Sequence, residues 1–170
     1  MAAKGRAMMI APGEGEVVLR GGIGVVRKVS AAATGGAFSV VEHPVEPGAL
    51  AAPPHTHATV DEYSFVIEGE IEVLMGEETF RAPAGSYVLK ARGIPHTFWN
   101  PGPEPARVLE IISPASFEQY FEELAGIFSS TLPGQPPDFV RIAEMAGRYG
   151  TTFHMERLPE IMEKHGVELR

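Results

Sequence analysis

The chain has 170 residues, 44% hydrophobic and 21% charged, as expected for one folded domain or one domain with an appendage. A net charge of −8 opposes phosphate-neutralising contacts and attraction to anionic lipid, so neither nucleic acid nor a membrane is expected as a partner. The absence of cysteine excludes disulfides, thiolate nucleophiles and cysteine-ligated zinc. Any metal site must therefore use histidine and carboxylate ligands.

The N-terminal region holds a short apolar run that Pro12 and Gly13 end well short of a secretory or membrane-spanning segment. We interpret residues 1–15 as a flexible leader and expect a cytoplasmic protein.

From residue 16 to about residue 112, short β-branched or aromatic runs alternate with glycine and proline turns, a spacing typical of an all-β sandwich or barrel. The pattern predicts a mostly β fold, with a barrel over residues 16–115. The predicted strands cover residues 24–29, 38–45, 63–68, 71–75, 86–90, 96–100 and 106–112.

Beyond Ser113 the hydrophobic period changes to that of a helix, which predicts a C-terminal helical extension over residues 116–170. The first helix should run from about 117 to 129, with Ser116 and Gln119 as a capping box. Asp138 should cap a second helix that ends at Gly150, and a short third helix should end at Gly166. One stripe of apolar side chains on the first helix indicates packing against the barrel or a partner subunit: Phe117, Tyr120, Phe121, Leu124 and Phe128.

Three histidines in the β region have an acidic neighbour. His55 and His57 are two residues apart, so a strand would place both rings on one face. A turn after them would bring the Glu62 carboxylate beside the rings. Histidines on strands are commonly ordinary hydrogen-bonded residues, so the pair alone does not establish a site.

The glycine frame around these residues is more specific. The chain reads Gly48, six residues, His55-Thr56-His57, four residues, Glu62, six residues, Gly69; then, after fifteen residues, Gly85, followed by Gly93, two residues, His96, three residues and Asn100. This double pattern resembles the two motifs of the cupin superfamily, with one extra residue before His55 and with Ala91 where proline is usual. The resemblance implies a jelly-roll β-barrel in which His55, His57, Glu62 and His96 bind one metal ion.

Imidazole and carboxylate ligands suit a divalent transition metal: Fe, Mn, Ni, Co or Zn. Three neutral histidines and one carboxylate leave a net charge near +1, which attracts an anionic ligand. Four protein ligands on a five- or six-coordinate ion leave open positions for water, substrate or dioxygen. The alternatives are a closed structural zinc site and a relative that holds no metal.

Strand parity predicts which side chains surround the site. From Glu62, alternation turns Ser64 and Val66 inward, and from His96 it turns Phe98 and Asn100 inward; we predict Ser64 and Phe98 as substrate-binding residues. The outward set is apolar and should be covered by the helical extension or by a second subunit in a homodimer: Tyr63, Phe65, Ile67, Thr97 and Trp99. Trp99 as a substrate platform is an alternative to this packing role.

Other charged and histidine residues have simpler interpretations. Lys90 and Arg92 flank the second motif and either steer an anionic substrate or are solvated loop charges, the second being favoured. His43, His154 and His165 have no recognisable partner and are interpreted as ordinary histidines.

The metal set together with the segment 112–118 resembles single-domain proteins grouped with quercetin 2,3-dioxygenase. This resemblance implies a metal-dependent dioxygenase acting on an aromatic or enol-bearing small molecule, with Glu62 as both metal ligand and catalytic base. A metal-dependent isomerase or decarboxylase and a metal-containing small-molecule binding protein remain the alternatives, because a fold does not fix a function.

Overall fold

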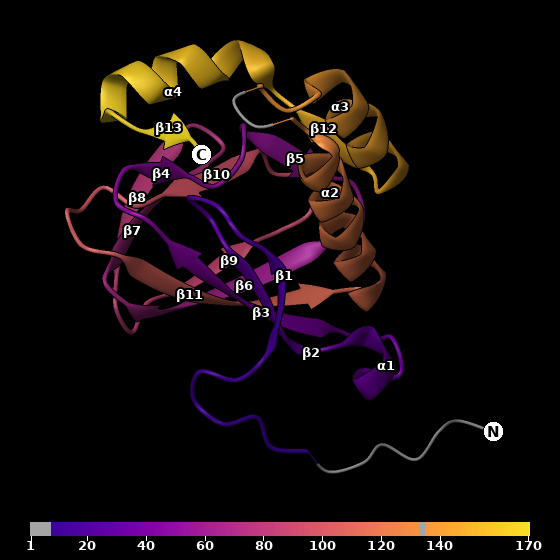
Figure 1. Cartoon of the computed structure of the whole chain (residues 1–170). Helices are drawn as coiled ribbons and strands as arrows, with labels where there is room; N and C mark the ends of the chain where they lie inside the picture. The colour runs from indigo at the N-terminus through magenta and orange to yellow at the C-terminus, as the bar shows by residue number, and fades with distance from the viewer. Residues whose placement is uncertain (1–7, 133–134) are drawn as a thin grey trace.

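A computed structural model describes residues 8–132 and 135–170. Two β-sheets pack face to face; of the C-terminal helices, α4 lies across the top of them in Figure 1, and α2 and α3 lie at the right. The strands are β1 (Glu16–Leu19), β2 (Val25–Val29), β3 (Ser39–Val45), β4 (Ala49–Leu50), β5 (His55–His57), β6 (Asp61–Glu68), β7 (Glu70–Met75), β8 (Glu78–Pro83), β9 (Tyr87–Lys90), β10 (His96–Trp99), β11 (Ala106–Ser113), β12 (Thr151–Phe153) and β13 (Glu168–Leu169). The helices are α1 (Ala31–Thr34), α2 (Glu118–Ser130), α3 (Phe139–Arg148) and α4 (Leu158–His165), with short 3-10 turns at Ala115–Phe117 and Met155–Arg157.

The first sheet has six strands in the order β1-β2-β3-β11-β6-β9. The second is built around β10, which pairs with β4, β5 and β7, while β7 also pairs with β8. All of these pairings are antiparallel. The predicted mostly β, jelly-roll fold is confirmed, and each of the seven predicted strands is present with ends that differ by two residues or fewer.

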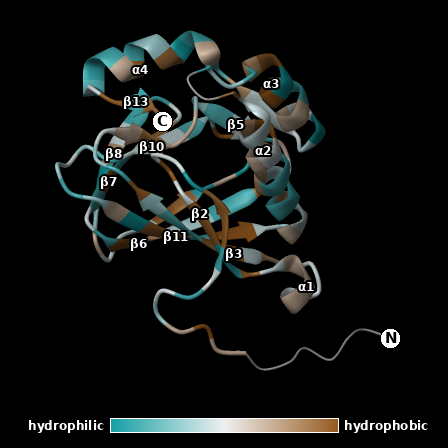
Figure 2. Ribbon diagram, viewed as in Figure 1, coloured by the Kyte–Doolittle hydropathy of each residue, from teal (hydrophilic) through white to brown (hydrophobic). Residues whose placement is uncertain are grey.

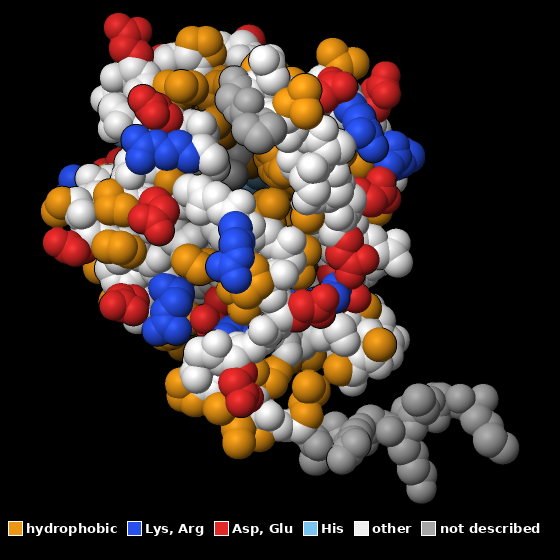
Figure 3. Space-filling view, viewed as in Figure 1, with side chains coloured by type: hydrophobic (Ala, Val, Ile, Leu, Met, Phe, Trp, Pro, Cys, Tyr) orange, Lys and Arg blue, Asp and Glu red, His pale blue; other side chains and the backbone are white. Residues whose placement is uncertain are grey.

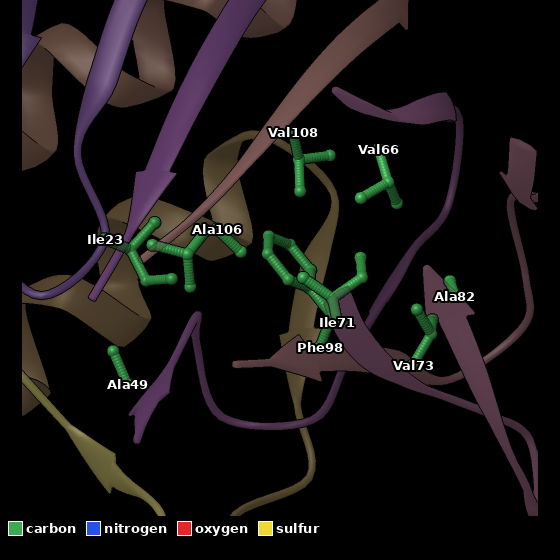
Figure 4. Close-up of a cluster of buried hydrophobic side chains, with 10 residues drawn as sticks. Ile23, Ala49, Val66, Ile71, Val73, Ala82, Phe98, Ala106 and Val108 are labelled. Carbon is green, nitrogen blue, oxygen red and sulfur yellow. The ribbon is translucent and has the colours of Figure 1, made fainter. Parts of the chain in front are cut away.

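The space between the sheets is filled by small and β-branched side chains around the ring of Phe98 (Figure 4). Alternation along each strand explains this core, because every second side chain points between the sheets. On β11, for example, Val108 and Ile112 are fully buried, whereas Ile111 between them is exposed. The predicted inward direction of Ser64, Val66 and Phe98 is confirmed by their burial.

The extension is not purely helical, contrary to the sequence-based expectation. Strand β12 pairs along its whole length with β5, the strand that carries His55 and His57. Strand β13 pairs in parallel with β4. These strands were missed because segments of two or three residues have no measurable period. The last part of the chain therefore completes the second sheet.

The helices present an apolar side to the barrel and a polar side to solvent (Figure 2). Asp138 caps α3 as predicted, because its Oδ1 accepts a hydrogen bond from the Arg141 amide at 3.0 Å. The predicted capping box is wrong. The 3-10 turn Ala115–Phe117 precedes α2, and no side chain caps that helix. Helix α4 covers Trp99, which is fully buried beside Leu158 and Ile161, so Trp99 has the predicted packing role. No helix among the described residues is long and apolar enough to cross a bilayer.

The outward side chains of the first sheet are not covered in the same way. Tyr63, Tyr87, Leu89 and Ile111 are exposed, and cross-strand pairing makes them neighbours: Tyr63 is opposite Leu89 and Ile111, and Phe65 is opposite Tyr87. A contiguous apolar patch of this kind is typical of an association surface.

The predicted homodimer should form through this patch. Tyr87 is 82% exposed, so Tyr87→Lys should leave the fold intact while placing a charge in the interface. We expect light scattering after size exclusion to give a dimer mass for the wild type and a monomer mass for the variant. A monomeric wild type at tens of micromolar would contradict the prediction.

Candidate metal centre

The structure brings His55, His57, Glu62 and His96 together at one end of the barrel. One ligand atom from each histidine lies within 4.8 Å of the others. His55 and His57 come from β5, and His96 on β10 is the cross-strand partner of His55. Glu62 comes from the neighbouring sheet, with its carboxylate oxygens 3.2 Å from His57 Nε2 and 3.4 Å from His96 Nε2.

The outer nitrogen of each ring is already engaged. His55 Nδ1 lies 2.9 Å from the Pro53 carbonyl oxygen, and His96 Nδ1 lies 2.9 Å from that of Ile94. His57 Nδ1 lies 2.9 Å from the Thr151 hydroxyl. A carbonyl only accepts, so His55 and His96 must carry the proton on Nδ1, which leaves Nε2 with a free lone pair. This is the arrangement that orients histidines for a metal.

The inner nitrogens are suited to bind a metal ion. Nε2 of His57 and Nε2 of His96 are buried, and neither has hydrogen-bond geometry to any described residue, Glu62 included. Leaving buried polar atoms unpaired costs about 1–3 kcal/mol each, so such atoms need an explanation. Burial, assisted by His96 and His57, lowers the pKa of His55 to about 3, so this ring is neutral, as a ligand must be.

Glu62 belongs to a network of buried charged groups that extends away from the histidines. Lys90 Nζ lies 2.8 Å from Glu62 Oε2 and also contacts Glu110 Oε1. Glu110 accepts a hydrogen bond from the Ser64 hydroxyl at 2.8 Å and lies 3.1 Å from His43 Nε2. All these groups are at least 95% buried.

Ion pairing keeps the groups of this buried network charged. Burial opposes ionisation of Glu62, but the positive charge of Lys90 holds its pKa well below the ordinary value. Attraction to Glu110 and Glu62 outweighs the effect of burial and raises the pKa of Lys90. Attraction to Lys90 and the hydrogen bond with His43 lower the pKa of Glu110 to about 2, although burial and the repulsion from Glu62 oppose this shift. Glu62 is therefore a carboxylate, the form that binds a metal.

A cavity of about 430 Å³ opens onto this site. Figure 3 shows a hollow on this face of the molecule, beside α2, with hydrophobic side chains around it. Its lining includes His55, His57 and Glu62, together with Lys90, Glu110 and His43. The walls are mainly apolar, and many come from the extension: Phe117, Tyr120, Phe121, Leu124, Phe128, Phe139, Ile142 and Phe153.

Residues 41–112 match the family described as Cupin domain. The chain therefore contains a cupin domain over these residues. A search of curated proteins finds no match to this sequence.

Solved structures resemble this cupin over part of its length. They include a predicted oxalate decarboxylase from Thermotoga maritima (20% identity, TM-score 0.50, covering 53% of this chain and 78% of that chain). A double-stranded β-helix protein from Klebsiella pneumoniae has 22% identity and a TM-score of 0.50, covering 62% of this chain and 84% of its own. A sugar phosphate isomerase from Silicibacter pomeroyi has 26% identity and a TM-score of 0.48, covering 54% of this chain. The cupin chain spans 59% of the Silicibacter protein, and these likenesses extend to the fold alone.

Of the two predicted substrate-binding residues, only one lines the cavity. Phe98 lines the cavity. Ser64 donates its hydrogen bond to Glu110 and is not among the lining residues. Asn100 is buried, and its side chain donates to the carbonyls of Val45 and Glu104, so it fixes a loop. Trp99 lies outside the cavity, where its indole nitrogen donates to Glu72. That the four ligands bind a metal, and that Ser64 and Phe98 contact substrate, stay predictions.

The sequence-based interpretation of Lys90 is wrong. Lys90 is not a solvated loop charge but a buried cation on β9, whereas Arg92 is exposed and paired with Asp61. Glu110 and His43 were also missed. All three sit at inward positions of their strands, so parity applied to β3, β9 and β11 would have placed them inside.

The hydroxyl of Thr151 should contribute to metal affinity because it orients His57 from the extension. We expect Thr151→Val to weaken Zn²⁺ or Co²⁺ binding about tenfold or more, as losses of such orienting partners usually do. Competition with a chromophoric chelator measures this change. Thr152→Val, an exposed neighbour on the same strand, is the matched control and should bind as the wild type does. Equal affinities for both variants would contradict a role for Thr151.

Proposed function

We propose that this cupin is a metal-dependent dioxygenase that acts on an aromatic or enol-bearing small molecule. The observation that carries the proposal is the convergence of three imidazoles beside Glu62, with His55, His57 and Glu62 lining a largely apolar cavity. The bound ion is proposed to be Fe, Mn, Ni or Co, held by His55, His57, His96 and Glu62. Such an ion supplies Lewis acidity and redox capacity when bound.

The charges of the cavity favour a singly charged anionic ligand. A divalent ion with three neutral histidines and Glu62 carries a net charge of about +1. The Lys90–Glu110 pair beside it is neutral as a unit, because the ammonium and the carboxylate are in contact. A substrate hydroxyl that ionises at the site therefore finds its negative charge compensated.

Glu62 is the residue proposed to accept the substrate's proton. Oε2 of Glu62 is held by Lys90 and lies 3.4 Å from His96, whereas Oε1 has only His57 nearby, at 3.2 Å. Oε1 is therefore the oxygen proposed to act as the general base, which must lie within hydrogen-bond reach of the substrate's hydroxyl. Loss of a positioned general base typically costs about 10²–10⁴-fold in rate.

The cavity walls favour a substrate with a substantial apolar part. Aromatic and aliphatic side chains line most of the cavity, and its volume of about 430 Å³ lies in the range of small-molecule sites. Apolar walls also keep water from the reacting atoms. Sugars and dicarboxylates would find few hydrogen-bond partners there.

Oxygen consumption tests the proposal directly. The protein is loaded with each metal in turn, mixed anaerobically with a panel of flavonols and enediols, and then exposed to oxygen. We expect oxygen uptake with at least one metal and one substrate. No uptake in any combination would refute the dioxygenase and leave an isomerase, a decarboxylase or a binding protein.

Glu62→Gln separates catalysis from binding. The variant should lose at least about a hundredfold in turnover while the anaerobic dissociation constant for the substrate changes little. Asp61→Asn is the matched control, because Asp61 is adjacent on β6 but points outward to Arg92. Retained turnover in Glu62→Gln would contradict the assignment of the base.

A further inference from the structure

Tyr120 belongs to the apolar cluster between the extension and the barrel, and it also lines the cavity at the candidate metal centre. It comes from α2, outside the cupin match, and its side chain is 8% exposed. It lines the same cavity as Glu62. Within residues 8–132 and 135–170 its hydroxyl makes no hydrogen bond to protein.

Aromatic contacts hold the Tyr120 ring in one place. Phe117 stacks on it, with ring centroids 4.8 Å apart and planes 10° apart, and Phe117 in turn meets the His57 ring edge-on at 4.7 Å. Phe121 and Tyr149 contact Tyr120 edge-on at 5.6 Å and 5.8 Å. The ring is thus fixed by a stack that begins at a candidate metal ligand.

Packing explains the ring of Tyr120 but not its hydroxyl. Phenylalanine would make the same ring contacts, so packing does not require the hydroxyl. Burial and the negative charge of Glu62 raise the pKa of Tyr120, so the hydroxyl keeps its proton and is a hydrogen-bond donor. No acceptor among the described residues takes this proton, which leaves the hydroxyl available to a ligand in the cavity.

The charged groups that line the cavity indicate which kind of acceptor a ligand would offer to Tyr120. Among the described lining residues, Lys90 and Arg170 are the only lysine or arginine side chains. Lys90 is already shared by Glu62 and Glu110, and Arg170 is bonded to Glu168 and the Pro47 carbonyl. A phosphate, with two negative charges, would find no lysine or arginine among these residues that lacks an acceptor already. A neutral acceptor such as a carbonyl oxygen suits a single tyrosine donor.

We infer that the Tyr120 hydroxyl donates a hydrogen bond to a carbonyl-type oxygen of the bound ligand, and that the extension thereby selects ring-containing enols or phenols that carry such an oxygen. This inference rests on the proposed function for the class of ligand. It assigns Tyr120 as a specificity-determining residue of the site.

Two probes that differ in one carbonyl test the inference. 1-Hydroxy-2-acetonaphthone has the carbonyl, and 2-ethyl-1-naphthol lacks it but has nearly the same shape. Calorimetry measures both dissociation constants on the full chain loaded with Zn²⁺, under anaerobic conditions, so that no turnover is involved. We expect the wild type to prefer the ketone, and Tyr120→Phe to reduce this preference about five- to tenfold.

Tyr149→Phe is the matched control. Tyr149 belongs to the same aromatic cluster, but its hydroxyl donates to Glu123 and it is not among the lining residues. Its preference for the ketone should equal that of the wild type. Thermal unfolding of all three proteins checks that the variants remain folded.

Two results would overturn the inference. One is a ketone preference that is the same within twofold in the wild type and Tyr120→Phe. The other is tighter binding of glucose 6-phosphate than of either naphthol, which would reject the ligand class. Neither depends on oxygen uptake, so a cupin that consumes no oxygen but shows the Tyr120 effect would refute only the dioxygenase.

Discussion

An ammonium group between two carboxylates lies inside this barrel, and the geometry of the candidate metal centre depends on it. Transferring a single ion into a protein interior costs several kcal/mol, so Lys90 is tolerable there only because Glu62 and Glu110 contact it. The same contacts restrain the carboxylates. Glu62 cannot turn away from the histidines without leaving Lys90 short of a partner, and Ser64 and His43 hold Glu110 on the other side. Electrostatic pairing thus fixes the one candidate ligand that comes from the opposite sheet.

The extension belongs to the site as much as the barrel does. The barrel motifs contribute the three imidazoles and Glu62, but the hydroxyl that meets His57 comes from Thr151. Phe117 packs against the same ring, and α2 and α3 supply much of the apolar wall. A cupin barrel with the same four residues and another extension would therefore offer a different cavity to its ligand.

The sequence allowed prediction of the features that local physics determines. Alternation identified the long strands and the inward direction of Ser64, Val66 and Phe98, because the pleat permits only two faces. The glycine frame identified the fold family and the four residues that come together. Strand β8 was missed because most of its residues are exposed, so it lacks an apolar alternation.

Contacts between distant parts of the chain were beyond such reasoning. Lys90 was predicted to be solvated because only its charge was considered, although its position on the strand predicts an inward side chain. The Thr151 contact joins residues 94 positions apart, and nothing in either segment indicates it. The unpartnered hydroxyl of Tyr120 is likewise visible only when the cavity is known.

The pairing of β5 with β12 also has a consequence for the order of events during synthesis. The strand bearing two of the three histidines finds its full-length partner only when residues 151–153 have been translated and have left the ribosome. A nascent chain that stops after the barrel holds those rings without Thr151 or the aromatic wall. The complete surroundings of the candidate metal centre therefore form late, because they need residues far along the chain from the barrel motifs.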